Sequence, residues 1–299
     1  MYYMLGLLVL LILVAYVTMQ RPGEQSSSGE AGEYLVDVDS LTVDKIEISS
    51  PSTRVVLERR GVEWFVEEPV SYRADQSNVA SMIHDSKNLQ VKSVVSTKPE
   101  KQSVFQVDST GTLVKMYGRG EEQAAFIIGK QGTSYMDVYA RRANSDDVAL
   151  ISGASNYAFN RPVKEWRDRS ILKVPQENIQ EVRFQYGDTT FVLAFRDSVW
   201  MIGRDSTQDW VVNSLLSSLS DFQADDFIDT IWTKPPRITV QISYAGAQLS
   251  FAYQKDGEKY VVQSSNSPQW FEVQSWRANQ ILKRKKDFCL LYTSDAADE

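Results

Sequence analysis

The side chains best suited to chemistry are few and far apart in this sequence. It has one histidine, His84, and one cysteine, Cys289, and neither belongs to a motif that pairs a nucleophile with a base. One residue of each type also excludes an internal disulfide and a zinc site built from several cysteines or histidines. We expect His84 to lie on a helix surface, because it falls within apolar residues at helical spacing.

Adjacent carboxylates are the next candidates, since paired acids serve acid–base and metal chemistry. Neighbouring residues of a strand point to opposite faces, so a pair in sequence is not a pair in space. We therefore interpret these acids as solvated residues of loops and strand ends. Asp37-Val38-Asp39 would place two acids on one face of a strand, but no Asp-x-Asp-x-Asp-Gly loop extends it into a calcium site. The adjacent pairs are Glu67-Glu68, Asp146-Asp147 and Asp225-Asp226.

Motifs for binding nucleotides or nucleic acids are also missing. Gly118-Arg119-Gly120 lacks a third glycine and a following helix, and no Gly-Lys-Ser/Thr sequence occurs. The sequence has 32 Lys and Arg and 39 Asp and Glu, and the resulting net charge of −7 argues against a nucleic-acid partner. We interpret the basic run at 283–286 as a solvated turn. The sequence thus predicts no catalytic, cofactor-binding or metal-binding residue and no enzymatic activity.

The elements that would position any site form two similar series. With 299 residues and 42% hydrophobic residues, the chain has room for two domains with cores of their own. Apolar residues of three successive strands recur at a spacing of 136 residues. The matched positions are Ile46 and Val182, Val56 and Val192, and Trp64 and Trp200.

A helical pattern follows the third strand in each series, around Val79 in the first and Val212 in the second. Further short strands of alternating polarity come after it, and turn signals separate them. An amphipathic helix can cover the apolar face of such a sheet. We predict an α+β protein with two tandem copies of a mostly antiparallel β domain, each with one principal amphipathic helix. The copies span 34–174 and 175–288, and Trp64 and Trp200 belong to their cores.

The first twenty residues differ from the rest, because residues 2–20 carry no charge and are largely aliphatic. We predict a transmembrane anchor over 1–20, inserted through residues 2–19 and followed by a flexible linker over 21–33. A cleaved signal peptide is the main alternative, but 15–19 offers no good cleavage site. A buried core helix is the other alternative.

The last eleven residues, 289–299, resemble the translated end of a sequencing-library adapter. The alternative is a genuine short tail. We expect this segment to be non-native and the second copy to be truncated near Phe288, where the first copy continues through Trp166-Arg167-Asp168.

Six short motifs occur along the soluble part of the chain. They are Val-Asp-x-Ile-Glu-Ile at 43–48, Val-Val-Leu-Glu-Arg at 55–59, Glu-x-x-x-Glu-x-Pro-Val at 63–70, Ala74-Asp75, Ser-Val-Val-Ser at 93–96 and Glu-Trp-Arg-Asp at 165–168. Together these motifs resemble a bacterial family of domains of unknown function, numbered 4340. The resemblance covers 34–288, and a Tyr-Gly-Leu-Asp element of the family is replaced here by Phe105-Gln106-Val107-Asp108.

The resemblance implies a single-pass envelope protein, similar to auxiliary proteins of ABC transporters of the gliding-motility type, without established catalytic residues. We therefore expect a non-enzymatic, membrane-anchored accessory or scaffold protein with protein partners in a transport complex. Its soluble part would lie on the outer, periplasmic or extracellular, side of the cytoplasmic membrane. An envelope module that binds polysaccharide or lipid is the alternative, and a hydrolase is a third reading.

Overall fold

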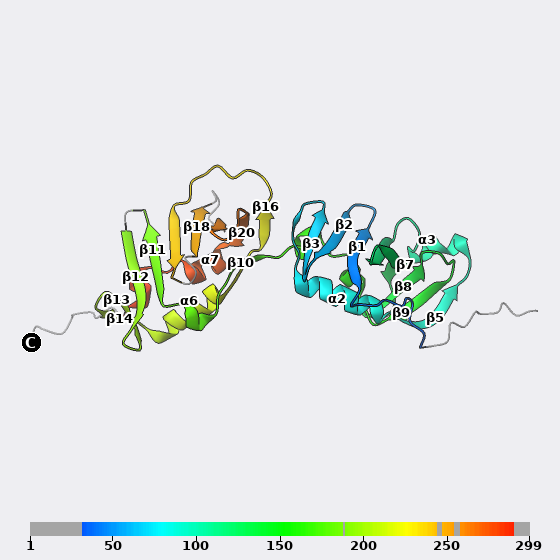
Figure 1. Ribbon diagram of the computed structural model, residues 1–299, viewed down its shortest axis with the longest axis horizontal. Coiled ribbons are helices and arrows are strands. Elements are labelled where there is room, and N and C mark those ends of the chain that lie inside the picture. The colour runs from blue at the N-terminus through cyan, green and yellow to red at the C-terminus, as the bar shows by residue number, and fades with distance from the viewer. Residues whose placement is uncertain (1–31, 188, 244–246, 254–257, 290–299) are drawn as a thin grey trace, which may run out of the picture. The chain divides into compact units, whose positions relative to one another are not determined.

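The computed structural model describes residues 32–187, 189–243, 247–253 and 258–289 (Figure 1). The predicted anchor, most of the linker and most of the suspected tail lie outside these ranges. Within them, no helix combines the length and the apolarity needed to cross a bilayer. The chain divides into two compact units, unit 1 up to Asp168 and unit 2 from Arg169 onward.

Unit 1 is built on a nine-stranded antiparallel sheet with the strand order β4-β3-β2-β1-β6-β7-β8-β9-β5. Residues of β6 alternate between buried and half-buried positions, as expected of a strand with one face on the core. The strands are β1 Val43–Ser49, β2 Arg54–Arg60, β3 Glu63–Glu68, β4 Tyr72–Arg73, β5 Gln90–Ser96, β6 Thr112–Gly118, β7 Glu121–Gln131, β8 Asp137–Arg142 and β9 Val148–Ser152.

The principal helix of unit 1, α2 (Gln76–Lys87), lies against one face of this sheet (Figure 1). Val79 and Met82 of the helix are buried in the same core as Ile46, Leu57 and Val66 of the strands. Short helices complete the unit: α3 Gln102–Phe105, preceded by a 3-10 turn Pro99–Lys101, α4 Asn156–Phe159 and α5 Val163–Trp166.

Unit 2 has a second nine-stranded antiparallel sheet, in the order β14-β13-β12-β11-β17-β18-β19-β20-β16. Its strands are β11 Glu181–Tyr186, β12 Thr189–Arg196, β13 Val199–Ile202, β14 Asp205–Ser206, β16 Asp226–Ile228, β17 Ile238–Ile242, β18 Gln248–Tyr253, β19 Lys259–Ser264 and β20 Trp270–Gln274. The helices are α6 Asp209–Ser220, α7 Ser275–Ile281 and α8 Lys285–Phe288, with a 3-10 turn at Gln176–Asn178.

One more pair of strands lies outside the two large sheets. β10 (Ser170–Lys173) pairs with β15 (Asp221–Gln223) of unit 2. This pairing explains why the structural boundary falls at Asp168, a few residues before the domain boundary at 174 that the sequence suggests.

The two large sheets follow one plan, because every strand of the first order has a counterpart at the same place in the second. Arg59 of β2 lies opposite Trp64 of β3, and Phe195 of β12 lies opposite Trp200 of β13. Both partners of the first pair are thus displaced by 136 residues from those of the second, since 59 + 136 = 195 and 64 + 136 = 200. The prediction of a mostly antiparallel β protein with few helices is confirmed.

The two tryptophans differ in burial. Trp64 is buried in the core of unit 1, as predicted. Trp200 is only half-buried, and its ring packs on that of Phe195, which is itself 42% exposed, with 5.4 Å between the ring centroids. The expectation that both would be core residues is therefore correct for the first and too strong for the second.

Candidate functional site

The residues that the sequence offers for chemistry lie apart from one another in the fold. His84 is exposed on α2. In the part of the chain that the structure describes, no group of three or more His, Cys, Asp or Glu is arranged to hold a metal ion. Asp37-Val38-Asp39 is not a strand, so its acids do not share a strand face as we had expected. Instead, Asp39 begins a turn, where its carboxylate accepts a hydrogen bond from the backbone N–H of Leu41 at 3.1 Å.

Acids of the adjacent pairs each have a separate local partner. Glu67 forms an ion pair with Arg60 at 2.5 Å. Asp146 accepts a hydrogen bond from the side chain of Gln102 at 2.9 Å. Asp225 binds the guanidinium of Arg277 at 3.0 Å. These contacts hold neighbouring elements together within a unit.

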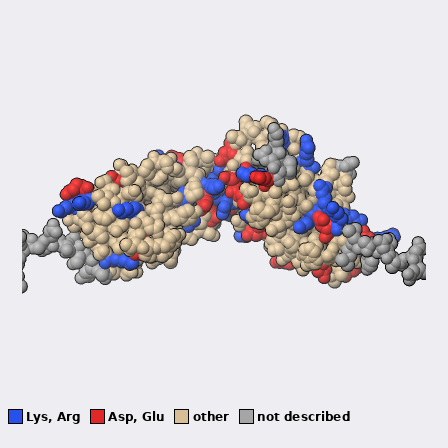
Figure 2. Space-filling model, turned by 180° about the vertical axis from the view of Figure 1, so that it is seen from behind, with Lys and Arg blue, Asp and Glu red and all other residues tan. Residues whose placement is uncertain are grey.

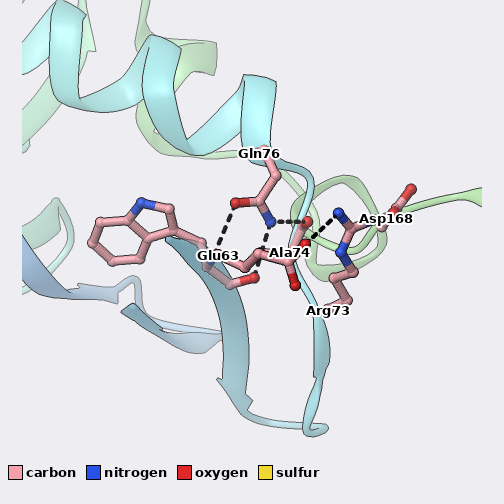
Figure 3. Close-up of polar contacts among 6 residues, drawn as sticks. Glu63, Arg73, Ala74, Gln76 and Asp168 are labelled. Atoms are coloured by element: carbon pink, nitrogen blue, oxygen red, sulfur yellow. Dashed lines mark hydrogen bonds and ion pairs between the residues drawn. The ribbon is translucent and has the colours of Figure 1, made fainter. Parts of the chain in front are cut away.

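The motif residues behave differently, since three separate motifs meet at the beginning of α2. We call this group the closing cluster: Glu63, Trp64, Arg73, Ala74, Asp75, Gln76 and the segment 165–168. Figure 3 labels five of its members, Glu63, Arg73, Ala74, Gln76 and Asp168. Its members come from β3, β4, the first turn of α2 and the end of α5 with the residues after it. The cluster is the place where the last segment of unit 1 returns to the sheet.

Backbone hydrogen bonds attach that last segment. The N–H of Asp75 donates to the carbonyl of Trp166 at 2.8 Å, and the N–H of Asp168 donates to the carbonyl of Arg73 at 2.9 Å. Between them, Ala74 and Arg167 form an antiparallel bridge. The segment therefore extends the edge of the sheet beside β4. Asp75 also caps α2, because its carboxylate accepts from the N–H of Asn78 at 2.9 Å.

Gln76 ties α2 to the neighbouring strands. Its side-chain oxygen accepts from the N–H of Trp64 at 2.8 Å, and its amide nitrogen donates to the carbonyls of Trp64 at 3.0 Å and Ala74 at 2.7 Å. The carbonyl of Trp64 also accepts from the N–H of Ala74 at 2.9 Å, whereas the N–H of Trp64 has Gln76 as its acceptor, and an unsatisfied buried group destabilises a fold. Figure 3 shows this side chain pointing from the helix toward the strand ends.

Arg73 supplies the charge of the cluster. Its guanidinium binds Glu63 at 2.8 Å and Asp168 at 2.5 Å, so that one cation joins two carboxylates that are far apart in sequence. The hydrogen bond that Arg73 donates to Glu63, with further attraction from Asp168, raises the pKa of Arg73, although partial burial opposes the change. These two ion pairs join β4 to β3 and to the segment after α5.

Aromatic rings contact arginine side chains in the same part of unit 1. Trp166 is fully buried, and the guanidinium of Arg161 lies 5.8 Å from the centroid of its ring. Arg167 is also buried, with its guanidinium over the ring of Tyr72 at 4.7 Å. The quadrupole of an aromatic ring attracts a cation that lies over its face. The cluster therefore combines apolar packing with positively charged groups that the rings stabilise.

Unit 2 closes in a similar manner. The N–H of Gln208, the residue before α6, donates to the carbonyl of Phe288 at 2.8 Å, which parallels the contact from Asp75 to Trp166. The hydroxyl of Thr207 donates to the carbonyl of Trp200 at 2.8 Å and replaces one of the bonds that Gln76 makes. Phe288 is fully buried against the rings of Phe184 and Phe191.

The sequence matches the model of a known protein family. The sequence model described as Domain of unknown function (DUF4340) matches residues 64–241, more than half of the chain. The chain belongs to the DUF4340 family. The matched range begins at Trp64 of β3 and ends in β17, so the DUF4340 match includes strands of both sheets. No curated protein and no solved structure matches this DUF4340 chain.

Sequence reasoning on this DUF4340 protein identified the motifs at 74–75 and 165–168 but not their contact. Gln76 and Arg73 were not singled out, although a Gln directly after a capping Asp is a signal that could have drawn attention to the start of α2. The partners of both residues are set by the return of a distant segment, which no local pattern encodes.

Proposed function

We propose that this DUF4340 protein is a non-enzymatic, membrane-anchored accessory or scaffold protein of an ABC-type transport complex in the bacterial envelope. In this proposal the uncharged segment 2–20 anchors the chain, and both units lie on the outer side of the membrane. Membership of the family and the order of segments in the sequence support it.

One observation carries the proposal: the acidic motif residues Glu63, Asp75 and Asp168 make contacts that close the fold. Arg73 binds Glu63 and Asp168, and Gln76 binds three backbone groups, all within unit 1. Residues engaged in this way stabilise a rigid module. A rigid module repeated in tandem suits a protein whose task is to hold partners.

Exposed apolar side chains in unit 2 offer a surface for such a partner. Phe195 is 42% exposed and Val199 53% exposed, and the half-buried Trp200 lies beside Phe195. All three belong to β12 and β13, next to the two-residue edge strand β14. Aromatic residues are enriched at protein interfaces, and strand edges accept strands from partners.

The proposal is tested by affinity purification of the full chain from bacterial membranes in several mild detergents, followed by mass spectrometry. We expect subunits of an ABC transporter to be recovered with the native chain and to be lost with a Phe195→Ser, Val199→Ser double variant. Val62→Ser is the matched control, because Val62 is 93% exposed in a hairpin of unit 1. Recovery of the chain without transporter subunits in every detergent would count against the proposal.

A role in binding envelope polysaccharide or lipid draws on a different observation. Trp210 of α6 is 71% exposed and Trp276 of α7 is 60% exposed, and exposed rings can stack on sugars or enter a membrane interface. Four hollows on the described surface have linings that include neither tryptophan. For this reason we place the alternative second. Retention of a Trp210→Ala, Trp276→Ala variant on isolated envelope polysaccharide and on lipid vesicles would decide against it.

A further inference from the structure

Each unit has a hollow at the same place in its fold. The hollow of unit 1 has a volume of about 490 Å³ and is lined by the turn after β1, the residues leading into β6 and the loop before α5. The hollow of unit 2 has a volume of about 570 Å³ and is lined by the end of β11, the beginning of β17 and the residue before α8.

The register of the strands shows that the two places are equivalent. Ser49 pairs with Leu113 in unit 1, and Gln185 pairs with Thr239 in unit 2, at the strand ends that border the hollows. The third wall begins in both units at the residue that precedes a four-residue helix. That residue is Pro162 before α5 in unit 1 and Arg284 before α8 in unit 2.

Both hollows are lined by arginine without any acidic residue. Arg161 is the only charged residue of the unit 1 lining, among hydroxyl and amide side chains such as Thr110 and Asn156. In unit 2, Arg237 and Arg284 line the hollow together with Gln185 and Thr239. The positive charge of these linings is opposite in sign to the net charge of the chain, which is −7.

The arginines of unit 2 differ from that of unit 1 in their partners. Arg161 faces the carboxylate of Glu165 at 3.9 Å. Among the described acidic residues, none forms an ion pair with Arg237 or Arg284. The hollow of unit 2 therefore has two arginines whose guanidinium groups have no ion-pair partner among the described acids, while the carboxylate of Asp287 accepts a hydrogen bond from the backbone N–H of Arg284 at 2.7 Å. Figure 2 shows basic side chains, with acidic ones among them, at the right-hand end of the view, on unit 2.

Tyr186 holds one of these cations in place. The guanidinium of Arg284 lies 3.6 Å from the centroid of the Tyr186 ring, and the phenol donates a hydrogen bond to the carbonyl of Lys283 at 2.7 Å. Burial raises the pKa of the phenol above its ordinary 10.0, and the protonated ring adds no negative charge to the hollow. A guanidinium ordered by a ring loses less freedom when it binds an anion.

We infer that the hollow of unit 2 is a binding site for a phosphate group, held by the guanidinium groups of Arg237 and Arg284. Guanidinium groups match the geometry of phosphate oxygens and bind them in pairs of parallel hydrogen bonds. A phosphate monoester carries between one and two negative charges at neutral pH, which suits two arginines better than one. The equivalent hollow of unit 1, with a single and partly neutralised arginine, binds the same group more weakly.

The inference is independent of the scaffold role and is tested by calorimetric titration of the full chain with inorganic phosphate at low salt. We expect saturable binding that Arg237→Gln or Arg284→Gln weakens by about tenfold, because each removes a charge-assisted contact. Arg204→Gln is the matched control: Arg204 is also exposed in unit 2, but it lies in the turn after β13 and does not line the hollow. Circular dichroism establishes that each variant is folded.

Three results would overturn the inference. They are no saturation up to about 20 mM phosphate, unchanged affinity in both hollow variants, and equal weakening by Arg204→Gln. A second arm identifies the source of the phosphate group, with dihexanoyl phosphatidic acid as a soluble lipid probe. Tighter binding of this probe than of inorganic phosphate indicates a lipid headgroup, and equal or weaker binding indicates a free phosphorylated molecule.

Discussion

Replacing Gln76 by alanine removes the side chain that joins α2 to the strands of unit 1. Three hydrogen bonds to the backbone of Trp64 and Ala74 are lost at once. Each is worth about 0.5–1.5 kcal/mol net. Because Gln76 is only half-buried, water can replace part of this loss, and we expect the opening free energy of the region to fall by about 2 kcal/mol.

Hydrogen exchange read by mass spectrometry measures this loss locally. A fall of about 2 kcal/mol corresponds to roughly thirtyfold faster exchange. We expect it in peptides from β3 and from the first turn of α2, since the N–H of Trp64 loses its acceptor. Peptides of unit 2 serve as an internal reference, because their closing contacts do not involve Gln76.

Two further variants separate the causes. Gln76→Glu keeps the acceptor for Trp64 but loses both donated bonds, so its exchange should lie between the native chain and Gln76→Ala. Gln102→Ala is the control, since Gln102 is a half-buried residue of unit 1 that makes a single bond to Asp146. Exchange in Gln76→Ala that rises less than about threefold, or no more than in the control, would refute the reasoning.

Three other predictions concern stability. Phe288→Ala should lower the free energy of unfolding of unit 2 by about 3–4 kcal/mol, because it empties a fully buried site against Phe184 and Phe191; denaturant unfolding that leaves unit 2 as stable as before would contradict this. Lys92→Met should cost about 1–3 kcal/mol by leaving the buried carboxylate of Asp137 without its partner at 2.6 Å, and adding Asp137→Asn should restore most of the loss; a double variant no more stable than the single one would argue against the charge as the cause. Burial raises the pKa of Asp85 above its ordinary 3.8 despite the opposing charges of His84 and Arg161, so its contribution to stability is full below that ordinary pKa and is lost as pH rises through the folded-state pKa. Asp85→Asn should therefore raise the thermal midpoint at pH 7 and change it little below about pH 3, and a variant that is less stable at pH 7 would reverse the sign of the argument.

Strand pairing within each unit could be predicted from sequence because it is local. Hairpins such as β2–β3 and β12–β13 join neighbours along the chain, and alternating polarity determines which residues face the core. The spacing of 136 residues then placed Trp64 and Trp200 in equivalent strands. The burial of Trp200 was less predictable, since it depends on Phe195 at the exposed end of β12.

The closing cluster could not be predicted in the same way. Arg73 and Asp168 are 95 residues apart, and the strands β4 and β14 have two residues each, too few for a periodic pattern. The acids at 37–39 alternate as in a strand, but hydrogen bonds from Leu41 and Thr42 to Asp39 stabilise a turn after them. The hollow of unit 1 is formed by four separate segments and that of unit 2 by three, and no single segment carries a signal for them.

An experimental structure of the full chain tests the central claim that two units of one fold close by the same contacts. We expect the two sheets to superpose strand for strand, with Trp64 opposite Arg59 and Trp200 opposite Phe195. We also expect the N–H of Asp75 to meet the carbonyl of Trp166 and the N–H of Gln208 to meet the carbonyl of Phe288. A structure in which Trp200 lies outside the third strand of its sheet, or in which Phe288 lies away from Gln208, would contradict this claim.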